Sequence, residues 1–259
     1  MRAECREPRD DRDRDRDRDR DRDPAMAGLS DRWRLERKGT GDVVSGERGV
    51  IFDLDGVLID SEPLHLQAFQ EVLAARGRRL TEQEYYARFI VYSDREVLEQ
   101  LLPAGEALET TLAAKERRYL ELLEAGVPIF PDGMALLSRT DGWRVGLATG
   151  SLRREVERVL RSLRVRERFG VVVTRDDCRK GKPDPEPYLL AAEALDLSPR
   201  RCVVIEDTPG GVRAAKAAGM ACVAVTHSCP RERLGEADMV VDDLATVHLA
   251  AVLAEGRVP

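Results

Sequence analysis

Two aspartates at the end of a short apolar run are the residues best placed to do chemistry. Residues 50–52 form the run Val-Ile-Phe, Asp53 and Asp55 follow it, and Gly56 ends it. Such a run predicts a buried strand of a parallel sheet, and ligands bind at the C-terminal edge of such sheets. Two carboxylates this close repel each other unless a cation lies between them, which points to a divalent ion with oxygen ligands. A solvated Asp-x-Asp-Gly turn is the alternative.

Three further polar stretches follow along the chain. They are Leu-Ala-Thr-Gly-Ser at 147–151, Lys-Gly-Lys-Pro-Asp-Pro at 180–185 and Val-Val-Ile-Glu-Asp-Thr-Pro-Gly-Gly at 203–211. Thr149, Gly150 and Ser151 offer a hydroxyl and backbone N–H groups at the start of a helix, a site suited to phosphate oxygens. Simple helix capping by Ser151 is the alternative.

Together with Asp-Leu-Asp-Gly-Val at 53–57, these stretches resemble the motifs of the haloacid dehalogenase-like hydrolase superfamily, in that family's order. The resemblance extends from about residue 49 to the C-terminus and is to the branch of β-phosphoglucomutase and phosphoglycolate phosphatase. It implies that Asp53 is a nucleophile and that Asp55 is a general acid–base whose backbone carbonyl also binds the metal. It also implies that Lys182, rather than the neighbouring Lys180, neutralises the transferring phosphoryl group.

Glu206 and Asp207 follow an apolar run at 203–205 and precede a helix that starts at Pro209. Adjacent residues at a strand end point to opposite faces, so both need not ligate a metal directly. We expect Asp207 to bind Mg²⁺ and Glu206 to act through water or as an outer partner, because Mg²⁺ uses few carboxylates and keeps several waters. Helix capping by Asp207 and Thr208 is the alternative.

The composition limits the classes of function. The chain has 259 residues and a net charge of −6, which gives no electrostatic reason to expect nucleic-acid binding. The apolar runs are too short to span a bilayer, and the N-terminus lacks the apolar core of a signal peptide. The five cysteines lack metal-ligand spacing, which indicates reduced thiols in a cytoplasmic protein, with Cys202 and Cys222 in the core. We expect a monomer that acts on a small phosphorylated metabolite and binds neither nucleic acid nor membrane.

The pattern of elements predicts an α/β fold, a doubly wound parallel sheet with an inserted all-helical cap domain. Residues 1–47 are an Asp/Arg-rich tail, expected to be disordered, and a linker. The catalytic core takes residues 48–62 and 128–259, and the cap takes 63–127, returning through a linker at 127–133. After the first strand, strands are predicted at 143–148, 169–174, 202–205, 220–225 and 238–241, and core helices at 153–161, 185–195, 209–218 and 243–253.

Helices alone are predicted between the first two strands, capped by Asp60 or Ser61, by Thr81 and by Ser93 or Asp94. In β-phosphoglucomutase-like proteins the position of His65 faces the site, which makes His65 a candidate substrate contact; a structural or solvated histidine is the alternative. Arg95 lies in a stretch, 89–95, that we expect to shape selectivity, and relatives often carry glycine where Val91 stands. We assign no role to His227 or His248.

These observations predict a Mg²⁺-dependent phosphatase that hydrolyses a small phosphate monoester, such as a sugar phosphate, through an aspartyl-phosphate. A sugar-phosphate mutase is the first alternative, because it uses the same intermediate. A catalytically silent scaffold is the second. Asp55 argues against a dehalogenase, since a halide leaving group needs no proton.

Overall fold

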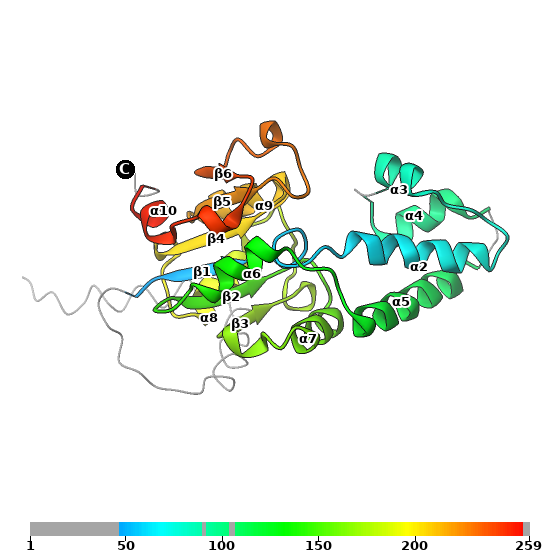
Figure 1. Ribbon diagram of the computed structural model, residues 1–259, viewed down its shortest axis with the longest axis horizontal. Coiled ribbons are helices and arrows are strands. Elements are labelled where there is room, and N and C mark those ends of the chain that lie inside the picture. Colours follow the sequence, from blue (N-terminus) through cyan, green and yellow to red (C-terminus); the bar gives the residue numbers. More distant parts are fainter. Residues whose placement is uncertain (1–46, 90–91, 104–106, 256–259) are drawn as a thin grey trace, which may run out of the picture. The chain divides into compact units, whose positions relative to one another are not determined.

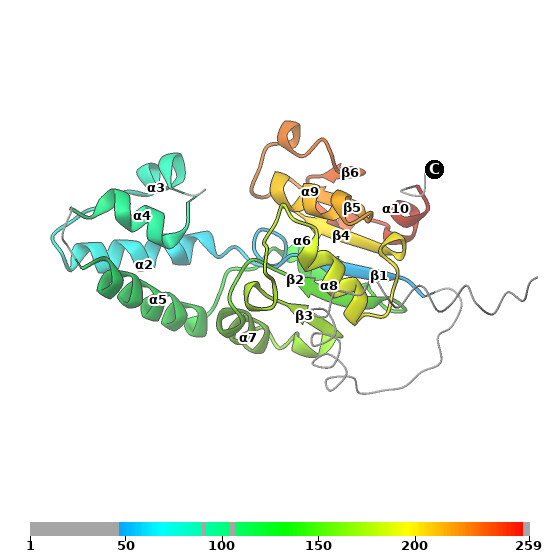
Figure 2. The same cartoon turned by 180° about the vertical axis from the view of Figure 1, so that it is seen from behind.

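The computed structural model describes residues 47–89, 92–103 and 107–255. Their strands form one six-stranded sheet with the order β3-β2-β1-β4-β5-β6, and every neighbouring pair is parallel (Figures 1 and 2). The α/β fold with an inserted helical segment confirms the predicted class. The strands are β1 Gly49–Phe52, β2 Arg144–Ala148, β3 Val171–Val173, β4 Cys202–Glu206, β5 Ala221–Val225 and β6 Met239–Val241.

The first strand, β1, lies between β2 and β4, and this position decides where the site forms. Phe52 pairs with Leu147 on one side and with Ile205 on the other. Asp53, the residue after β1, therefore reaches the carboxyl edge level with the end of β4, and its backbone N–H donates a 3.0 Å bond to the Ile205 carbonyl. All four residues of β1 are buried, as expected for a central parallel strand.

Helices cover both faces of the sheet, which explains the nearly continuous apolar strands. In Figure 1, α6 and α10 lie in front of the sheet, whereas Figure 2 shows α8 and α9 in front. The helices of this α/β part are α6 Pro131–Ser138, α7 Arg153–Ser162, α8 Glu186–Ala194, α9 Pro209–Ala217 and α10 Leu249–Glu255. Both cysteines predicted for the core, Cys202 and Cys222, are buried.

Of the described helices between β1 and β2, the four before α6 form the segment that we call the helical insert. They are α2 Glu62–Ala74, α3 Glu82–Arg88, α4 Asp94–Leu101 and α5 Leu108–Ala125. Thr81 caps α3 through a bond from the Glu84 N–H, and Ser93 forms a capping box with Glu96, so these two predicted caps are confirmed. The insert has an apolar cluster of its own, made by Leu66, Phe69, Leu73, Leu80, Tyr85, Phe89, Val97 and Leu98.

Two boundary predictions were wrong. The expected linker at 127–133 ends early, because Pro131 begins α6. Gly133 lies inside that helix, where an added Cβ would meet the Val57 carbonyl oxygen at 2.0 Å, so this glycine permits close packing and is no turn signal. The terminal helix starts at Leu249, later than expected, because Asp243 caps a separate 3₁₀ turn, Leu244–Thr246.

Several predictions concern residues outside the described ranges. These include the disordered tail, nearly all of the 25–47 linker and the turn at Val91. Among the described helices, none is both long and apolar enough to cross a membrane. The division into a catalytic core and a cap domain remains a prediction.

Candidate active site

Asp53 follows β1 directly and faces a lysine that a second acid also holds. Its Oδ1 accepts a 2.8 Å hydrogen bond from the Leu54 N–H, which fixes the carboxylate. Its Oδ2 lies 3.0 Å from Lys182 Nζ, and the same ammonium lies 2.7 Å from Glu206 Oε1. The fold thus brings together three of the predicted site residues, from β1, from β4 and from the loop before α8.

Glu206 ends β4 and is completely buried, with both oxygens occupied. Oε1 accepts hydrogen bonds from Lys182 Nζ at 2.7 Å and from the Tyr188 hydroxyl at 2.8 Å. Oε2 accepts from the backbone N–H groups of Asp207 and Thr208 and from the Thr208 hydroxyl, each at 2.9 Å. A carboxylate with this many donors is suited to orienting Lys182, and the indirect role of Glu206 near a metal stays a prediction.

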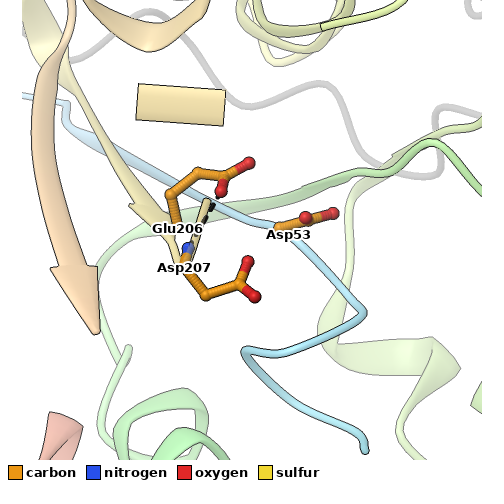
Figure 3. A group of neighbouring side chains, drawn as sticks. All are labelled: Asp53, Glu206 and Asp207. Atoms are coloured by element: carbon orange, nitrogen blue, oxygen red, sulfur yellow. Dashed lines mark hydrogen bonds between the residues drawn. The ribbon is translucent and has the colours of Figure 1, made fainter. Parts of the chain in front are cut away.

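Asp207 differs from Glu206, because its Oδ1 is buried and has no hydrogen-bond donor among the described residues. Oxygens of Asp53, Glu206 and Asp207 lie within 4.8 Å of one another. Figure 3 shows Glu206 and Asp207 extending in different directions from the end of β4, with Asp53 opposite them. An unpartnered carboxylate oxygen in an acidic cluster fits a divalent cation with oxygen ligands.

Two glycines are needed for these carboxylates to lie where they do. Gly56 has φ +74°, and an added Cβ would lie 1.8 Å from Asp207 Oδ2. At Gly211, in the first turn of α9, an added Cβ would lie 1.6 Å from Glu206 Oε1. A side chain at Gly56 or at Gly211 would occupy the space that the carboxylates of Asp207 and Glu206 fill.

Three buried carboxylates share one ammonium, and their pKa values reflect the shortage of positive charge. Burial raises the pKa of Asp53 to about 7, with Lys182 opposing and Glu206 and Asp55 adding to the rise. Burial and the charges of Glu206 and Asp53 raise the pKa of Asp207 well above its usual range. Burial also disfavours ionised Glu206, but Lys182 and the backbone donors lower its pKa to about 2. A bound divalent cation would lower the pKa of Asp53 and Asp207.

Asp55 lies two residues beyond Asp53 and is held by serines from two other elements. Ser61, at the start of α2, donates to Asp55 Oδ1, and Ser151 donates to Oδ2 at 2.6 Å. Ser61 occupies the predicted N-cap position but makes no side-chain cap bond, because its hydroxyl is directed to Asp55 instead. Both oxygens of the predicted general acid–base therefore have fixed partners.

Thr149, the residue after β2, is buried beside this group. Its Oγ1 accepts a 3.1 Å bond from the Ser151 N–H, and its own N–H donates to the Val173 carbonyl. The turn at Gly150 is open, because an added Cβ there would meet nothing within 4 Å. The 149–151 turn therefore presents a hydroxyl donor and free space next to Asp55, an arrangement that can receive phosphate oxygens.

Comparison with known proteins identifies the family. A model described as haloacid dehalogenase-like hydrolase matches residues 47–219, which include Asp53, Asp55, Thr149, Lys182, Glu206 and Asp207. The chain belongs to the haloacid dehalogenase-like hydrolases.

Relatives of this hydrolase include both phosphatases and mutases. The phosphorylated carbohydrates phosphatase of Thermotoga maritima is 36% identical over 187 residues, covering 69% of this chain and 85% of that protein. β-Phosphoglucomutase of Bacillus subtilis is 34% identical over 214 residues, covering 78% and 92%. The crystal structure of CbbY from Rhodobacter sphaeroides in complex with phosphate superposes with a TM-score of 0.69 at 30% identity, covering 80% of this chain and 99% of that one.

The helical insert of this haloacid dehalogenase-like hydrolase contributes a polar cluster around a buried lysine. Lys115 of α5 is fully buried, and its Nζ lies 2.6 Å from both His65 Nδ1 and Asp94 Oδ2. His65 Nδ1 also lies 3.6 Å from Asp94 Oδ1, so the imidazole contacts both members of the ion pair. The His65 ring stacks on Tyr119 at 3.9 Å, so His65 is neither isolated nor simply solvated.

Arg95 is adjacent to Asp94 in sequence but has other partners. Its guanidinium lies 2.8 Å from Glu109 Oε1 on α5 and 4.0 Å from Glu99 Oε1. The predicted contact between Arg95 and substrate remains a prediction.

His227, to which the sequence assigned no role, supports the loop that carries Asp55. Its Nδ1 lies 2.9 Å from the Gly56 carbonyl oxygen, and its Nε2 lies 3.2 Å from Asp132 Oδ2. Its ring stacks on Phe130 with centroids 3.9 Å apart. It thus joins the loop after β1 to the segment that leads into α6.

Sequence reasoning missed Tyr188 and Lys115. Tyr188 occupies an apolar position of α8, and only the packing of α8 against the sheet brings its hydroxyl to Glu206. Lys115 lies in a highly charged helix, where a solvated lysine is the ordinary expectation. The sequence feature that could have indicated its burial is its position four residues before Tyr119, on the same helix face.

Proposed function

We propose that this protein is a Mg²⁺-dependent phosphatase that hydrolyses a small phosphate monoester, such as a sugar phosphate, through an aspartyl-phosphate. One observation carries the proposal. Asp53 is buried between Lys182, at 3.0 Å from its Oδ2, and Asp207, whose Oδ1 has no donor among the described residues, while Asp55 is fixed two residues away. The site thus combines a nucleophile, a cation, a metal-binding oxygen and an acid–base group.

In the first step an Asp53 carboxylate oxygen attacks phosphorus, and the bond from phosphorus to the ester oxygen breaks. Asp55, in its protonated form, gives its proton to the leaving alkoxide. Lys182 balances charge on the phosphoryl group, and Glu206 keeps the ammonium in place. The Thr149 hydroxyl and the Gly150 N–H of the 149–151 turn bind the phosphoryl oxygens.

In the second step water attacks the phosphorus of the aspartyl-phosphate. Asp55, now ionised, takes a proton from that water, the bond from phosphorus to Asp53 breaks, and inorganic phosphate leaves. The serine partners of Asp55 keep its carboxyl group in the same position for both proton transfers.

The residues that fit the metal are Asp53, Asp207 and the backbone carbonyl of Asp55, with Glu206 acting through water. Mg²⁺ would supply positive charge next to the phosphoryl group. Such charge stabilisation contributes most of the catalytic effect in phosphoryl transfer. A hard ion with oxygen ligands suits this donor set better than a softer metal does.

A sugar-phosphate mutase is the second candidate, favoured by the similarity to β-phosphoglucomutase of Bacillus subtilis. A mutase would pass the phosphoryl group from Asp53 to a sugar hydroxyl, with the same acid–base group. Hydrolysis asks less of the helical insert, because only water must reach the intermediate.

The test is phosphate release from a panel of phosphorylated metabolites, with Mg²⁺ and with excess chelator. We expect release only with Mg²⁺, and a loss of several orders of magnitude in Asp53→Asn, which keeps the side-chain shape but lacks the charge. Asp141→Asn, at a carboxylate that is 90% exposed, is the matched control. Full activity in chelator would contradict the proposal. Rapid conversion of β-glucose 1-phosphate to glucose 6-phosphate, with little free phosphate, would favour the mutase.

A further inference from the structure

The polar cluster of the helical insert hides its cation and presents its carboxylate to solvent. Lys115 and Asp94 form a 2.6 Å ion pair in which the lysine side chain is 0% exposed and the aspartate side chain is 36% exposed. The positive partner is therefore hidden, and the negative partner meets whatever enters from solvent.

The surroundings keep Lys115 occupied. Its ammonium lies over the Phe69 and Tyr119 rings, at 4.6 and 4.8 Å from their centroids, and also contacts His65. Burial disfavours ionised Asp94, but hydrogen bonds from His65 and Lys115 and the lysine charge lower its pKa to about 2. Asp94 thus stays ionised at neutral pH, and the lysine has no unused side open to a substrate anion.

Tyr119 connects this cluster to the site. Its hydroxyl hydrogen-bonds Ser61, which in turn donates to Asp55. Burial raises the pKa of Tyr119, and the charges of Asp55, Glu155 and Asp94 act on the same hydroxyl in the same direction. The charges of Asp94 and of Asp55, the proposed acid–base group, therefore act on one hydroxyl, which places Asp94 near the site.

Other carboxyl groups add to this negative environment. Glu62, the first residue of α2, accepts a 2.7 Å bond from the Tyr85 hydroxyl. Glu155 of α7 accepts a 3.0 Å bond from the Leu152 N–H. The charges of His65, Asp55 and Lys115 act on both glutamates, which places these acids around the same cluster.

We propose that Asp94 excludes substrates with a second phosphate, so that the enzyme acts on sugar or polyol monophosphates whose far end is uncharged. This inference rests on the proposed phosphatase function and narrows its substrate class. Hydroxyl groups can donate to the exposed Asp94 oxygen, whereas a phosphate there would be repelled. The site is then divided by charge, with cations around the reacting phosphate and a carboxylate facing the other end.

The test compares kcat/KM for matched pairs such as fructose 6-phosphate with fructose 1,6-bisphosphate, and glucose 6-phosphate with glucose 1,6-bisphosphate. We expect the wild type to prefer the monophosphate, and Asp94→Asn to reduce this preference by about tenfold, mainly through a lower KM for the bisphosphate. Glu99→Gln, which removes one carboxylate from the other end of α4, should leave the preference unchanged.

A double variant, Asp94→Asn with Lys115→Met, controls for an effect of the single substitution on folding. Asp94→Asn leaves the charge of the buried Lys115 unbalanced, and adding Lys115→Met removes that charge. Because the double variant still lacks the Asp94 carboxylate, we expect its preference for the monophosphate to be reduced as well, and a double variant that regains the wild-type preference would contradict the inference. Circular dichroism and thermal unfolding verify that each variant is folded. If Asp94→Asn does not fold, the double variant, which lacks the unpaired buried cation, must show the reduced preference, and a preference as strong as that of the wild type would overturn the inference.

The outcomes separate this inference from the function on which it rests. A wild type that releases phosphate from neither member of any pair contradicts the phosphatase proposal itself. A wild type that hydrolyses monophosphates and bisphosphates equally well overturns the inference while the phosphatase remains. An unchanged preference in folded Asp94→Asn also overturns it.

Discussion

Ser151 Oγ lies 2.6 Å from Asp55 Oδ2, although the two residues are 96 positions apart in sequence. The contact exists because β1 and β2 are neighbours in the sheet, so the loops that follow them meet at one edge. Ser61 holds the other oxygen of the same carboxylate. The predicted acid–base group is therefore fixed from two sides before any substrate arrives, which lowers the cost of orienting it for proton transfer.

Replacing Ser151 with alanine should loosen Asp55 without unfolding the protein. We expect kcat with sugar phosphates to fall by roughly tenfold or more, because the proton must come from a less ordered carboxyl group. Hydrolysis of p-nitrophenyl phosphate should fall less, since its leaving group needs little protonation. Steady-state kinetics with both substrates measure the difference.

Ser162→Ala is the matched control for this prediction. Ser162 ends α7, and its hydroxyl donates to the Val159 carbonyl. It should change neither rate. Equal losses for the two substrates in Ser151→Ala would show that the serine acts on phosphate binding instead of on Asp55.

Gly56→Ala should damage the site far more than an equally strained alanine elsewhere. Gly56 and Gly77 have similar φ values, +74° and +71°, but a Cβ at Gly56 would meet Asp207 Oδ2 at 1.8 Å, while one at Gly77 meets nothing within 4 Å. Backbone strain of about 1 kcal/mol is common to both variants. We expect Gly77→Ala to lose a little stability and keep its activity, and Gly56→Ala to lose Mg²⁺ activation as well. Titration of activity with Mg²⁺ decides between the outcomes, and similar curves for the two variants would contradict the role of Asp207.

Stability should depend on pH and metal together. Folding raises the pKa of Asp53 from its ordinary 3.8 to about 7. In the metal-free protein the native state therefore holds a proton that the unfolded chain has lost, so stability falls as pH rises from about 4 to about 7. Mg²⁺ replaces that proton, and the increase in Tm caused by Mg²⁺ should be larger near pH 8 than near pH 5.

Thermal unfolding with and without millimolar Mg²⁺ measures this effect. Asp207→Asn should abolish the Mg²⁺ response at both pH values, and Asp141→Asn should keep it. A Mg²⁺ response that is equal at both pH values would show that the ion binds away from the buried carboxylates.

The arrangement of the site edge was predictable because parallel strands impose it. Apolar runs that end in Asp53, Thr149 and Glu206 had to bring those residues to one edge of the sheet. The helix caps at Thr81 and Ser93 were predictable for a similar reason, because capping depends on residues a few positions apart. In each case a short sequence pattern was sufficient to predict the position of the residue.

Contacts between distant elements were not predictable in this way. Ser61 has the signature of an N-cap, yet its hydroxyl bonds Asp55, because the fold brings a stronger acceptor close to it. The two prolines in 127–133 suggested a linker, whereas Pro131 begins α6 and Gly133 permits that helix to pack against Val57. The ion pair of Lys115 and Asp94 depends on how α4 and α5 pack, which no short motif records.

Trapping the phosphorylated enzyme tests the central claim most directly. The wild type, turning over a sugar phosphate with Mg²⁺, is quenched in acid and treated with borohydride, which reduces an aspartyl-phosphate to homoserine. Mass spectrometry of the peptide that contains residue 53 then locates the change. We predict homoserine at position 53 only when substrate and Mg²⁺ are both present. Turnover that leaves Asp53 unmodified, or that modifies another residue, would contradict the account.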